Sequence, residues 1–265
     1  METNLFTYLI ACPLVFLAGF VDAIAGGGGL ISLPGYLIAG LPPIMASATN
    51  KLSAGMGATV AFGNYLKNGF VNLKLSVPCV IVAMIFSSLG ARVQMMIPEH
   101  YLKIFMLVAL PVTLIIVLNK ETLKPKIFFS AKLTKEVFIK ALIISMVTGF
   151  YDGLYGPATG TFLLIFFVKI IGMNIKDANG IAKAINWATN MGALVLFISS
   201  GRVLMSLGIV CGLFNMLGNY LGSNLFMKKG VDIARPIMIA VMIIFIIRVT
   251  MELLHIQLNL IIIGD

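Results

Sequence analysis

The sequence predicts an all-α integral membrane protein made of two inverted-topology repeats of about five hydrophobic segments each. Three observations predict it. The 265 residues are 60% hydrophobic and only 11% charged, with a mean hydropathy of +1.04, whereas soluble domains are about 45–50% apolar and about 25% charged. Several apolar stretches approach or exceed the roughly 20 residues that span a bilayer. The second half of the chain also repeats the first.

The repeat is visible when the sequence is compared with itself at a fixed shift. At a shift of 132 residues, Lys51 falls on Lys183. Near the glycine-rich stretch the shift is 130, and the pattern Gly-Phe-x-Asp-x-x-x-Gly occurs at both 19–26 and 149–156. Charged residues and glycines that match in constant order indicate an internal duplication.

Each half contains five apolar segments, so we expect about eight to ten membrane segments in total. We divide the chain into a first repeat (1–118), a basic linker (119–136) and a second repeat (137–265). Two of these segments, 29–40 and 158–172, are short. Twelve residues of helix reach only about 18 Å, less than the thickness of the membrane's hydrocarbon core, so we interpret these segments as broken or partial helices. The expected segments are 5–24, 29–40, 44–66, 75–96 and 102–118 in the first repeat, and 137–154, 158–172, 178–199, 204–226 and 234–251 in the second.

Basic residues predict the orientation of the chain. Short loops rich in lysine lie on the cytoplasmic side, so we place the linker 119–136 inside and both termini outside a cell inner (plasma) membrane. Alternating crossings then put loop 67–74 inside and loop 200–203 outside, which makes the repeats inverted. If the two short segments are re-entrant, the repeat becomes parallel, and this arrangement fits the lysines less well.

Composition also limits the partners and cofactors. The net charge of +9 is concentrated near the linker, and no basic surface interleaved with stacking aromatics is visible, so we expect no nucleic-acid partner. The three dispersed cysteines form no disulfide framework and no metal-ligand spacing. We expect no cofactor and no metal, and association with a second copy of the chain stays open.

Two matched interruptions are the strongest functional signal. Gly26–Gly29 and Gly156–Gly160 each precede a short helix, and interrupted segments at matching positions of inverted repeats indicate a secondary transporter. The free N–H groups at a helix N-terminus bind anions. The candidate donors are Gly27, Gly28 and Gly29 in the first repeat, and Thr159, Gly160 and Thr161 in the second. Alternatively, the glycines only permit close helix packing.

Two lysines and several amides are further candidates for binding. Lys51 and Lys183 fall inside apolar segments, where a lysine usually marks a functional path, although a long side chain can also snorkel to the interface. Asn50 precedes Lys51, and Asn186 and Asn190 share a helical face with Lys183. These amides either donate to an anion or join helices by hydrogen bonds.

Asp22 and Asp152 occupy equivalent positions just before the two interruptions. Three interpretations remain open: they relay protons, they pair with Lys51 and Lys183, or they cap the short helices. The matched Cys79 and Cys211 are typical of small apolar packing residues. The sequence contains no His, Cys and carboxylate cluster with catalytic spacing, so we do not expect an enzyme.

These motifs resemble the sulfite exporter TauE/SafE family, also called the 4-toluene sulfonate uptake permease family. The resemblance rests on stretches 19–34, 48–51 and 149–162, and covers essentially the whole chain. It implies transport of small sulfur-containing anions and organic acids, such as sulfite, sulfonates and sulfoacetate. One departure is Ala158, because the family's second motif usually has glycine there, and a methyl group narrows access to the backbone.

The sequence therefore predicts a secondary transporter of small anions, with sulfur-containing anions as the first choice of substrate. The anion would bind between the two glycine breaks, with Asp22 or Asp152 coupling its movement to protons, while one repeat rocks against the other. The alternatives are a passive anion channel and a transporter of a small carboxylate. The expected partners are the small anion and the lipid bilayer.

Overall fold

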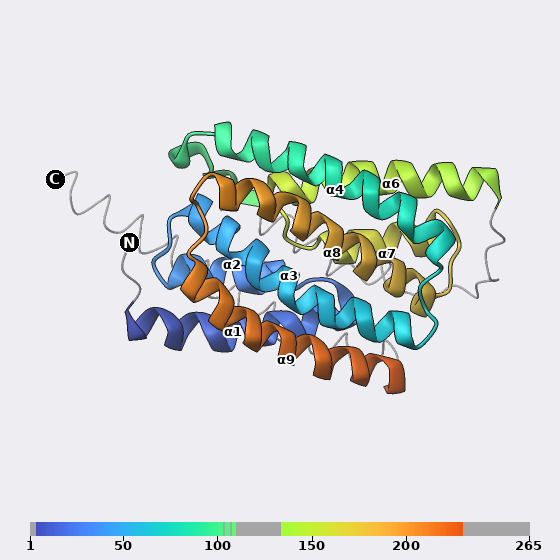
Figure 1. Cartoon of the computed structure of the whole chain (residues 1–265), viewed down its shortest axis with the longest axis horizontal. Coiled ribbons are helices and arrows are strands. Elements are labelled where there is room, and N and C mark those ends of the chain that lie inside the picture. The colour runs from blue at the N-terminus through green and yellow to red at the C-terminus, as the bar shows by residue number, and fades with distance from the viewer. Residues whose placement is uncertain (1–3, 103, 107, 110–133, 230–265) are drawn as a thin grey trace.

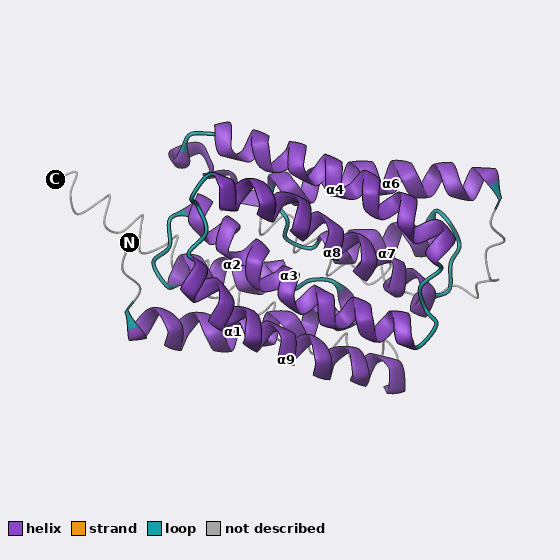
Figure 2. Ribbon diagram, viewed as in Figure 1, coloured by secondary structure: helices purple, strands orange, loops and turns teal. Residues whose placement is uncertain are grey.

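The protein is described from a computed structural model that covers residues 4–102, 104–106, 108–109 and 134–229. Within these ranges the regular structure is helical and contains no strand (Figure 2). Most of the predicted segment 102–118, most of the linker 119–136 and the whole segment 234–251 lie outside the described residues.

The described helices closely follow the apolar segments that the sequence predicts. Asparagine or threonine caps four of the N-termini, because Asn4, Asn72, Thr134 and Asn174 each accept a hydrogen bond from the main chain of the first turn. The helices are α1 (Leu5–Ala25), α2 (Gly29–Ile38), α3 (Pro43–Lys67), α4 (Leu73–Met96), α6 (Lys135–Leu154), α7 (Thr159–Lys169), α8 (Ile175–Ser199) and α9 (Met205–Lys229).

Five of these helices are long and apolar enough to cross a membrane, namely α1, α4, α6, α8 and α9. α3 also has 25 residues, but it is not among the five, and many of its side chains are small or polar. α4 exposes an apolar side chain about once per turn, at Leu73, Val77, Ile81 and Ile85. Such a stripe suits contact with lipid, and the chain is a multi-pass helical membrane protein.

The two short helices do not cross the molecule, because each folds back on the helix before it. A Cβ added to Gly28 would lie 2.6 Å from the Cβ of Asp22, and one added to Gly35 would lie 3.1 Å from the Cβ of Leu14. In the second half, the rings of Tyr151 and Phe162 lie 5.5 Å apart. The α1–α2 and α6–α7 segments are therefore two helical hairpins, and the glycine-containing interruptions are their tips.

The hairpin tips meet in the centre of the bundle. The main-chain N–H of Thr161 donates to the carbonyl oxygen of Gly26 at 3.1 Å, and the hydroxyl of Thr161 donates to the carbonyl oxygen of Ala25 at 2.8 Å. Gly26 has φ of +80°, in the region that glycine adopts without strain. These contacts satisfy main-chain groups that a helix end would otherwise leave unpaired.

The helices pack into two groups that do not coincide with the two halves of the sequence. α1 packs most extensively against α9, and α4 packs most extensively against α6. We call α1, α2, α3 and α9 the α1–α9 group, and α4, α6, α7 and α8 the α4–α6 group; in Figure 1 they form the lower and upper parts of the bundle. A separate apolar cluster, from Leu75 to Ile185, lies within the α4–α6 group and the loop between α7 and α8.

Small residues explain these close contacts. Gly218 and Gly222 of α9 lie against the carbonyl oxygens of Phe16 and Phe20 on α1, where an added Cβ would approach to 2.2 and 2.4 Å. Glycine lets two helix backbones approach in this way, and such interfaces hold membrane helices together without a hydrophobic driving force. Each group thus contains one long helix from the other half of the sequence.

Lysines mark one end of the bundle. Figure 1 shows the α3–α4 connection, the α7–α8 connection, the start of α6 and the end of α9 at the same end. The α2–α3 and α8–α9 connections lie at the opposite end. The residues at the first end include Lys67, Lys74, Lys135, Lys169, Lys176 and Lys228.

Candidate functional site

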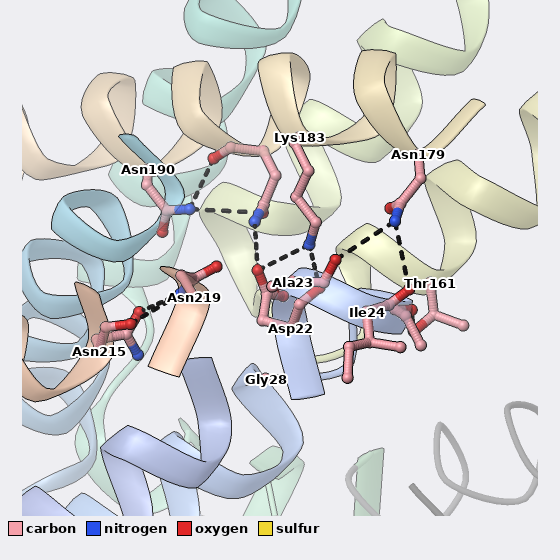
Figure 3. A network of polar contacts seen from close by, with 12 residues as sticks. Asp22, Ala23, Ile24, Gly28, Thr161, Asn179, Lys183, Asn190, Asn215 and Asn219 are labelled. Atoms are coloured by element: carbon pink, nitrogen blue, oxygen red, sulfur yellow. Dashed lines mark hydrogen bonds and ion pairs between the residues drawn. The ribbon is translucent and has the colours of Figure 1, made fainter. Parts of the chain in front are cut away.

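Both lysines that the sequence places inside apolar segments form ion pairs with the aspartates that precede the hairpin tips. Lys51 Nζ lies 2.6 Å from Asp152 Oδ2, and both side chains are 3% exposed. Lys183 Nζ lies 2.9 Å from Asp22 Oδ2 and also donates to the main-chain carbonyl oxygen of Asp22 (Figure 3). Each lysine therefore pairs with the aspartate of the other half, which is one of the three interpretations left open by the sequence.

The helices place these four residues at the same depth. Lys51 follows the start of α3 at Pro43, and Lys183 follows the start of α8 at Ile175, by the same length of about 12 Å. Asp22 and Asp152 lie in the last turn of α1 and α6, where the carbonyl groups of a helix end carry partial negative charge and favour a cation. Both ammonium groups thus lie next to the hairpin tips.

A small cavity lies between the two tips and the two ion pairs. Its volume is about 30 Å³, counted as the space that the centre of a water molecule can occupy, whereas a single water needs roughly 10–15 Å³. In this conformation the cavity has room for about two waters. Ten residues predicted for the site line it: Asp22, Gly28, Gly29, Asn50, Lys51, Asp152, Thr159, Gly160, Asn186 and Asn190.

Main-chain donors are left free at the start of both short helices. Among the hydrogen bonds of residues 4–102 and 134–229, none uses the main-chain N–H of Gly27–Gly29 or of Gly160. Gly28, Gly29 and Gly160 are also part of the cavity lining. Free N–H groups and the partial positive charge of a helix N-terminus are suited to an anion.

Three predicted residues lie outside the cavity lining. Thr161 uses both its N–H and its hydroxyl to hold the tip of the first hairpin, so its amide is not free for a ligand. Lys183 is fully buried behind Asp22. An added Cβ on Gly27 would have Thr161 as its nearest neighbour, at 3.7 Å.

The amide side chains differ in how fully their hydrogen bonds are satisfied. Asn190 donates to the main-chain oxygen of Asn186 at 2.6 Å, and Asn186 lies 3.5 Å from the carboxylate of Asp22. The Oδ1 atom of Asn50 is buried and has no hydrogen-bond partner. A buried polar atom without a partner is unusual, and here it belongs to a residue that lines the cavity.

Sequence reasoning missed two asparagines near the site. Asn215 of α9 lines the cavity and receives a hydrogen bond from Asn219, one turn later. Asn179 of α8 donates to the hydroxyl of Tyr65 at 2.7 Å and to the main-chain oxygen of Ile24 at 3.3 Å (Figure 3). The spacing of Asn215 and Asn219 in an apolar helix was the available signal, since paired amides at i and i+4 share a face.

Ala158 occupies a strained position in the second tip. Its φ of +63° makes it the one residue other than glycine with positive φ in the described part of the chain. An alanine pays roughly 1–2 kcal/mol for this conformation. Ala158, the departure from the family motif, therefore lies where the main-chain conformation favours glycine. Its methyl group strains the main chain and also narrows access to it.

The arrangement suits binding rather than covalent chemistry. In the described residues, no three His, Cys, Asp or Glu side chains gather as a metal site would require. Cys12, Cys79 and Cys211 are free and buried, and the Sγ atoms of Cys12 and Cys211 lie 3.5 Å apart. The two lysines and two aspartates balance in charge, so the site is neutral while both carboxylates are ionised.

The sulfite exporter TauE/SafE family model matches residues 11–249. The chain belongs to the sulfite exporter TauE/SafE family. Three relatives of this chain are named probable membrane transporter proteins, and none of these names denotes an enzyme. No solved structure matches this TauE/SafE chain.

The similarity to these relatives extends over most of each chain. A protein of Sinorhizobium sp (ORF9) is 37% identical over 91% of this chain and 91% of its own. A protein of Haemophilus influenzae is 34% identical over 84% of this chain and 87% of its own. YfcA of Escherichia coli is 34% identical over 86% of this chain and 84% of its own. The family model's match over residues 11–249 includes both hairpin tips and both ion pairs.

Proposed function

We propose that this protein is a secondary transporter of small anions, with sulfur oxyanions such as sulfite and sulfonates as its first candidates. The observation that carries the proposal is the cavity between the hairpin tips, where free helix N-terminal amides meet a buried lysine. The name of the family supports sulfite, and the relatives' names support transport.

The chemistry of the cavity favours an oxyanion over other small solutes. Sulfite and sulfonates each carry three oxygens that accept hydrogen bonds, and the N–H groups of Gly28, Gly29 and Gly160 supply donors that no group in the described part of the chain uses. Lys51 adds a positive charge at the same cavity. A sulfonate or sulfite uses more of these donors than a carboxylate, which has one oxygen fewer.

The packing supports a modified view of alternating access. The expected motion was a rocking of one repeat against the other, but this would disrupt the extensive α1–α9 and α4–α6 contacts. We propose that the α1–α9 group moves against the α4–α6 group instead. Both ion pairs bridge these groups, since Lys51 and Asp22 belong to the first, and Asp152 and Lys183 to the second.

The fold-back of the short helices is compatible with an inverted repeat, contrary to the expectation that re-entrant segments make it parallel. Each hairpin returns the chain to the end where it began: α1 starts at the end of the α2–α3 connection, and α6 starts at the opposite end, with the α7–α8 connection (Figure 1). Matched contacts also support the inverted repeat. Gly222 of α9 lies against the carbonyl oxygen of Phe20 on α1, and Gly90 of α4 lies against the carbonyl oxygen of Phe150 on α6. The shifts of 132 and 130 relate the members of these two pairs to one another. The lysine-rich end of the bundle favours an orientation in the inner membrane with that end in the cytoplasm.

Transport into proteoliposomes tests the proposal. The purified chain is reconstituted, and uptake of labelled sulfite, methanesulfonate, sulfoacetate and acetate is measured against empty liposomes. We expect saturable uptake of at least one sulfur oxyanion, accelerated by the same unlabelled anion inside. A linear, non-saturating flux without this acceleration indicates a channel, and preference for acetate indicates a carboxylate transporter. Absence of uptake of all four anions contradicts the proposal.

Two single substitutions on α3 test whether anion uptake depends on the cavity. Lys51→Gln removes the positive charge from the cavity lining, and we expect uptake to fall by about tenfold or more, as for an intramembrane charge on a substrate path. Lys67→Gln, at the exposed end of α3, removes the same charge from the same helix and is expected to retain uptake. Equal rates for the wild type and both variants would exclude Lys51 from the anion site.

A further inference from the structure

The two ion pairs have equivalent positions in the sequence but different surroundings. Lys51 has one protein acceptor among the described residues, Oδ2 of Asp152, so two of its three ammonium hydrogens stay unused. Lys51 and Asp152 both line the cavity. Lys183 binds both the carboxylate and the main-chain oxygen of Asp22, and it lies outside the lining.

The glycines next to the two ion pairs also differ in the space that they leave. A Cβ added to Gly156 would lie 3.3 Å from Lys51 Nζ and 3.5 Å from Asp152 Oδ1, so the absence of a side chain leaves space beside this ion pair. The equivalent Gly26 lies against the main chain of Gly160 instead, at 2.1 Å from the added Cβ. Only the Lys51–Asp152 pair therefore has both a free donor and room beside it.

We propose that an entering anion displaces Asp152 from Lys51 and that Asp152 takes up the proton that accompanies the anion, while the Lys183–Asp22 pair stays closed. This inference rests on the proposed anion transport. In the step, the Lys51 ammonium exchanges one carboxylate oxygen for an oxygen of the anion, and the released carboxylate binds the proton that enters with the anion from the aqueous side. Charge balances, because one anion and one proton enter together.

The cost of a buried charge drives the protonation. A carboxylate that is 3% exposed and has lost its cation is strongly unfavourable, and such a group becomes neutral rather than staying ionised in an apolar site. The Lys183 pair has a different role. It ties α8 to the last turn of α1 through two acceptors, and so it serves as the fixed point about which the two groups move.

No other charged side chain in the described part of the chain faces Asp152. The remaining charged residues of the cavity wall are Asp22 and, behind it, Lys183, which balance each other. The charged groups of α6 itself and of the helices packed against it lie near the helix ends and are exposed or half-buried: Lys135, Glu136 and Lys140 on α6, Lys74 and Arg92 on α4, Lys169 on α7, and Lys176 and Asp177 on α8.

The experiment compares the same substitution at the two equivalent aspartates. The full chain is reconstituted with a pH-sensitive dye inside the liposomes, and proton and anion uptake are measured together with methanesulfonate and with sulfite. Methanesulfonate keeps its single charge at every pH used. We expect the wild type to move about one proton per methanesulfonate, as a carboxylate relay allows.

Asp152→Asn is expected to lower the number of protons moved per anion by about tenfold or more, whatever the absolute anion flux, and the remaining flux is expected to be independent of pH and electrogenic. Asp22→Asn is expected to retain the wild-type proton-to-anion ratio and to lower the melting temperature. For sulfite, which itself titrates, each variant is compared with the wild type under the same conditions.

Three outcomes overturn the inference. The wild type moves the anion without protons, Asp152→Asn still takes up protons with the anion, or Asp22→Asn abolishes the wild-type proton-to-anion ratio. Absence of wild-type flux for both anions contradicts the proposed function itself. If Asp152→Asn does not fold, the double variant Lys51→Gln with Asp152→Asn replaces it, since two amides preserve a hydrogen bond without charge. In that variant the protons moved per anion are measured on the remaining anion flux and are expected to be close to none; a wild-type ratio on that flux equally overturns the inference.

Discussion

Gly26 and Gly160 touch through their main chains, so that the two hairpins meet without any side chain between them. A Cβ on Gly26 would lie 2.1 Å from the carbonyl carbon of Gly160, and the residue has φ of +80°. The tips of α1–α2 and α6–α7 can therefore approach only where both chains have glycine, and the cavity owes its position to this contact.

Gly26→Ala is expected to destabilise the protein by about 2–5 kcal/mol, because a positive φ costs alanine about 1–2 kcal/mol and overpacking adds about 1–3 kcal/mol. Gly40→Ala is the matched control, since Gly40 also has a positive φ, of +91°, but has nothing within 4 Å of an added Cβ. Unfolding in detergent measures both. Equal losses of stability for the two variants would mean that the tip contact contributes nothing.

Ala158→Gly is expected to raise stability by up to about 1.5 kcal/mol. Relief of the strained φ gains about 1–2 kcal/mol, and the greater freedom of glycine in the unfolded chain takes back about 0.5–1 kcal/mol. Ala182→Gly, in the buried middle of α8, is the control and is expected to lower stability. A lower melting temperature for Ala158→Gly than for the wild type would contradict the strained conformation.

Cross-links distinguish the two descriptions of the moving parts. Cys12 of α1 and Cys211 of α9 have Sγ atoms 3.5 Å apart, and both helices belong to the α1–α9 group. Oxidation to a disulfide is expected to leave anion uptake within about twofold of the reduced protein, because a cross-link inside one packed group does not restrain motion between groups. A rocking of one sequence half against the other predicts complete inhibition instead.

A cross-link between the groups supplies the contrast. An added Cβ on Gly55 of α3 would lie 3.5 Å from the Cβ of Asn190 on α8, within the range for a disulfide. The Gly55→Cys and Asn190→Cys pair, introduced into a chain without Cys12 and Cys211, is expected to stop uptake when oxidised and to restore it on reduction. Uptake that is the same in both states would contradict movement between the groups.

The Lys183–Asp22 pair is expected to contribute mainly to stability. Lys183→Met leaves the carboxylate of Asp22 without its cation and is expected to cost about 3–5 kcal/mol. Adding Asp22→Asn to this variant removes the orphaned charge and is expected to recover most of that loss. Melting temperatures of the two single variants and the double variant measure the coupling, and strictly additive effects would show that the ion pair does not stabilise the fold.

The helices were largely predictable because their signals are local. Caps at Asn4, Thr134 and Asn174, and the glycines at the breaks, depend only on neighbouring residues, and the expected bounds lie close to those of the structure. The direction of the short helices was not predictable in the same way. Whether α2 continues across the membrane or folds back on α1 depends on the contact of Gly35 with Leu14, which no local pattern specifies.

The candidate site was predicted as a set of residues, but not as an arrangement. Matched motifs selected Asp22, Asp152, Lys51 and Lys183, because charged residues that recur in apolar segments at a constant shift are unusual. Pairing was left open. Thr161 was predicted as a donor to the anion, but it uses its N–H and hydroxyl to hold the first tip and does not line the cavity. Asn215 was missed, since an asparagine in an apolar helix is equally typical of helix packing.

The sequence alone determined that the chain is a helical membrane protein with two matched breaks and four matched charged residues in or beside apolar segments, because hydropathy, glycine conformation and repeat spacing are properties of local chain segments. Only the tertiary structure decided that α4 and α9 pack with the opposite halves, and that Lys51 binds Asp152 while Lys183 binds Asp22. The physical reason is distance along the chain. These ion pairs join residues 101 and 161 positions apart, and such contacts form only when the helices between them have packed.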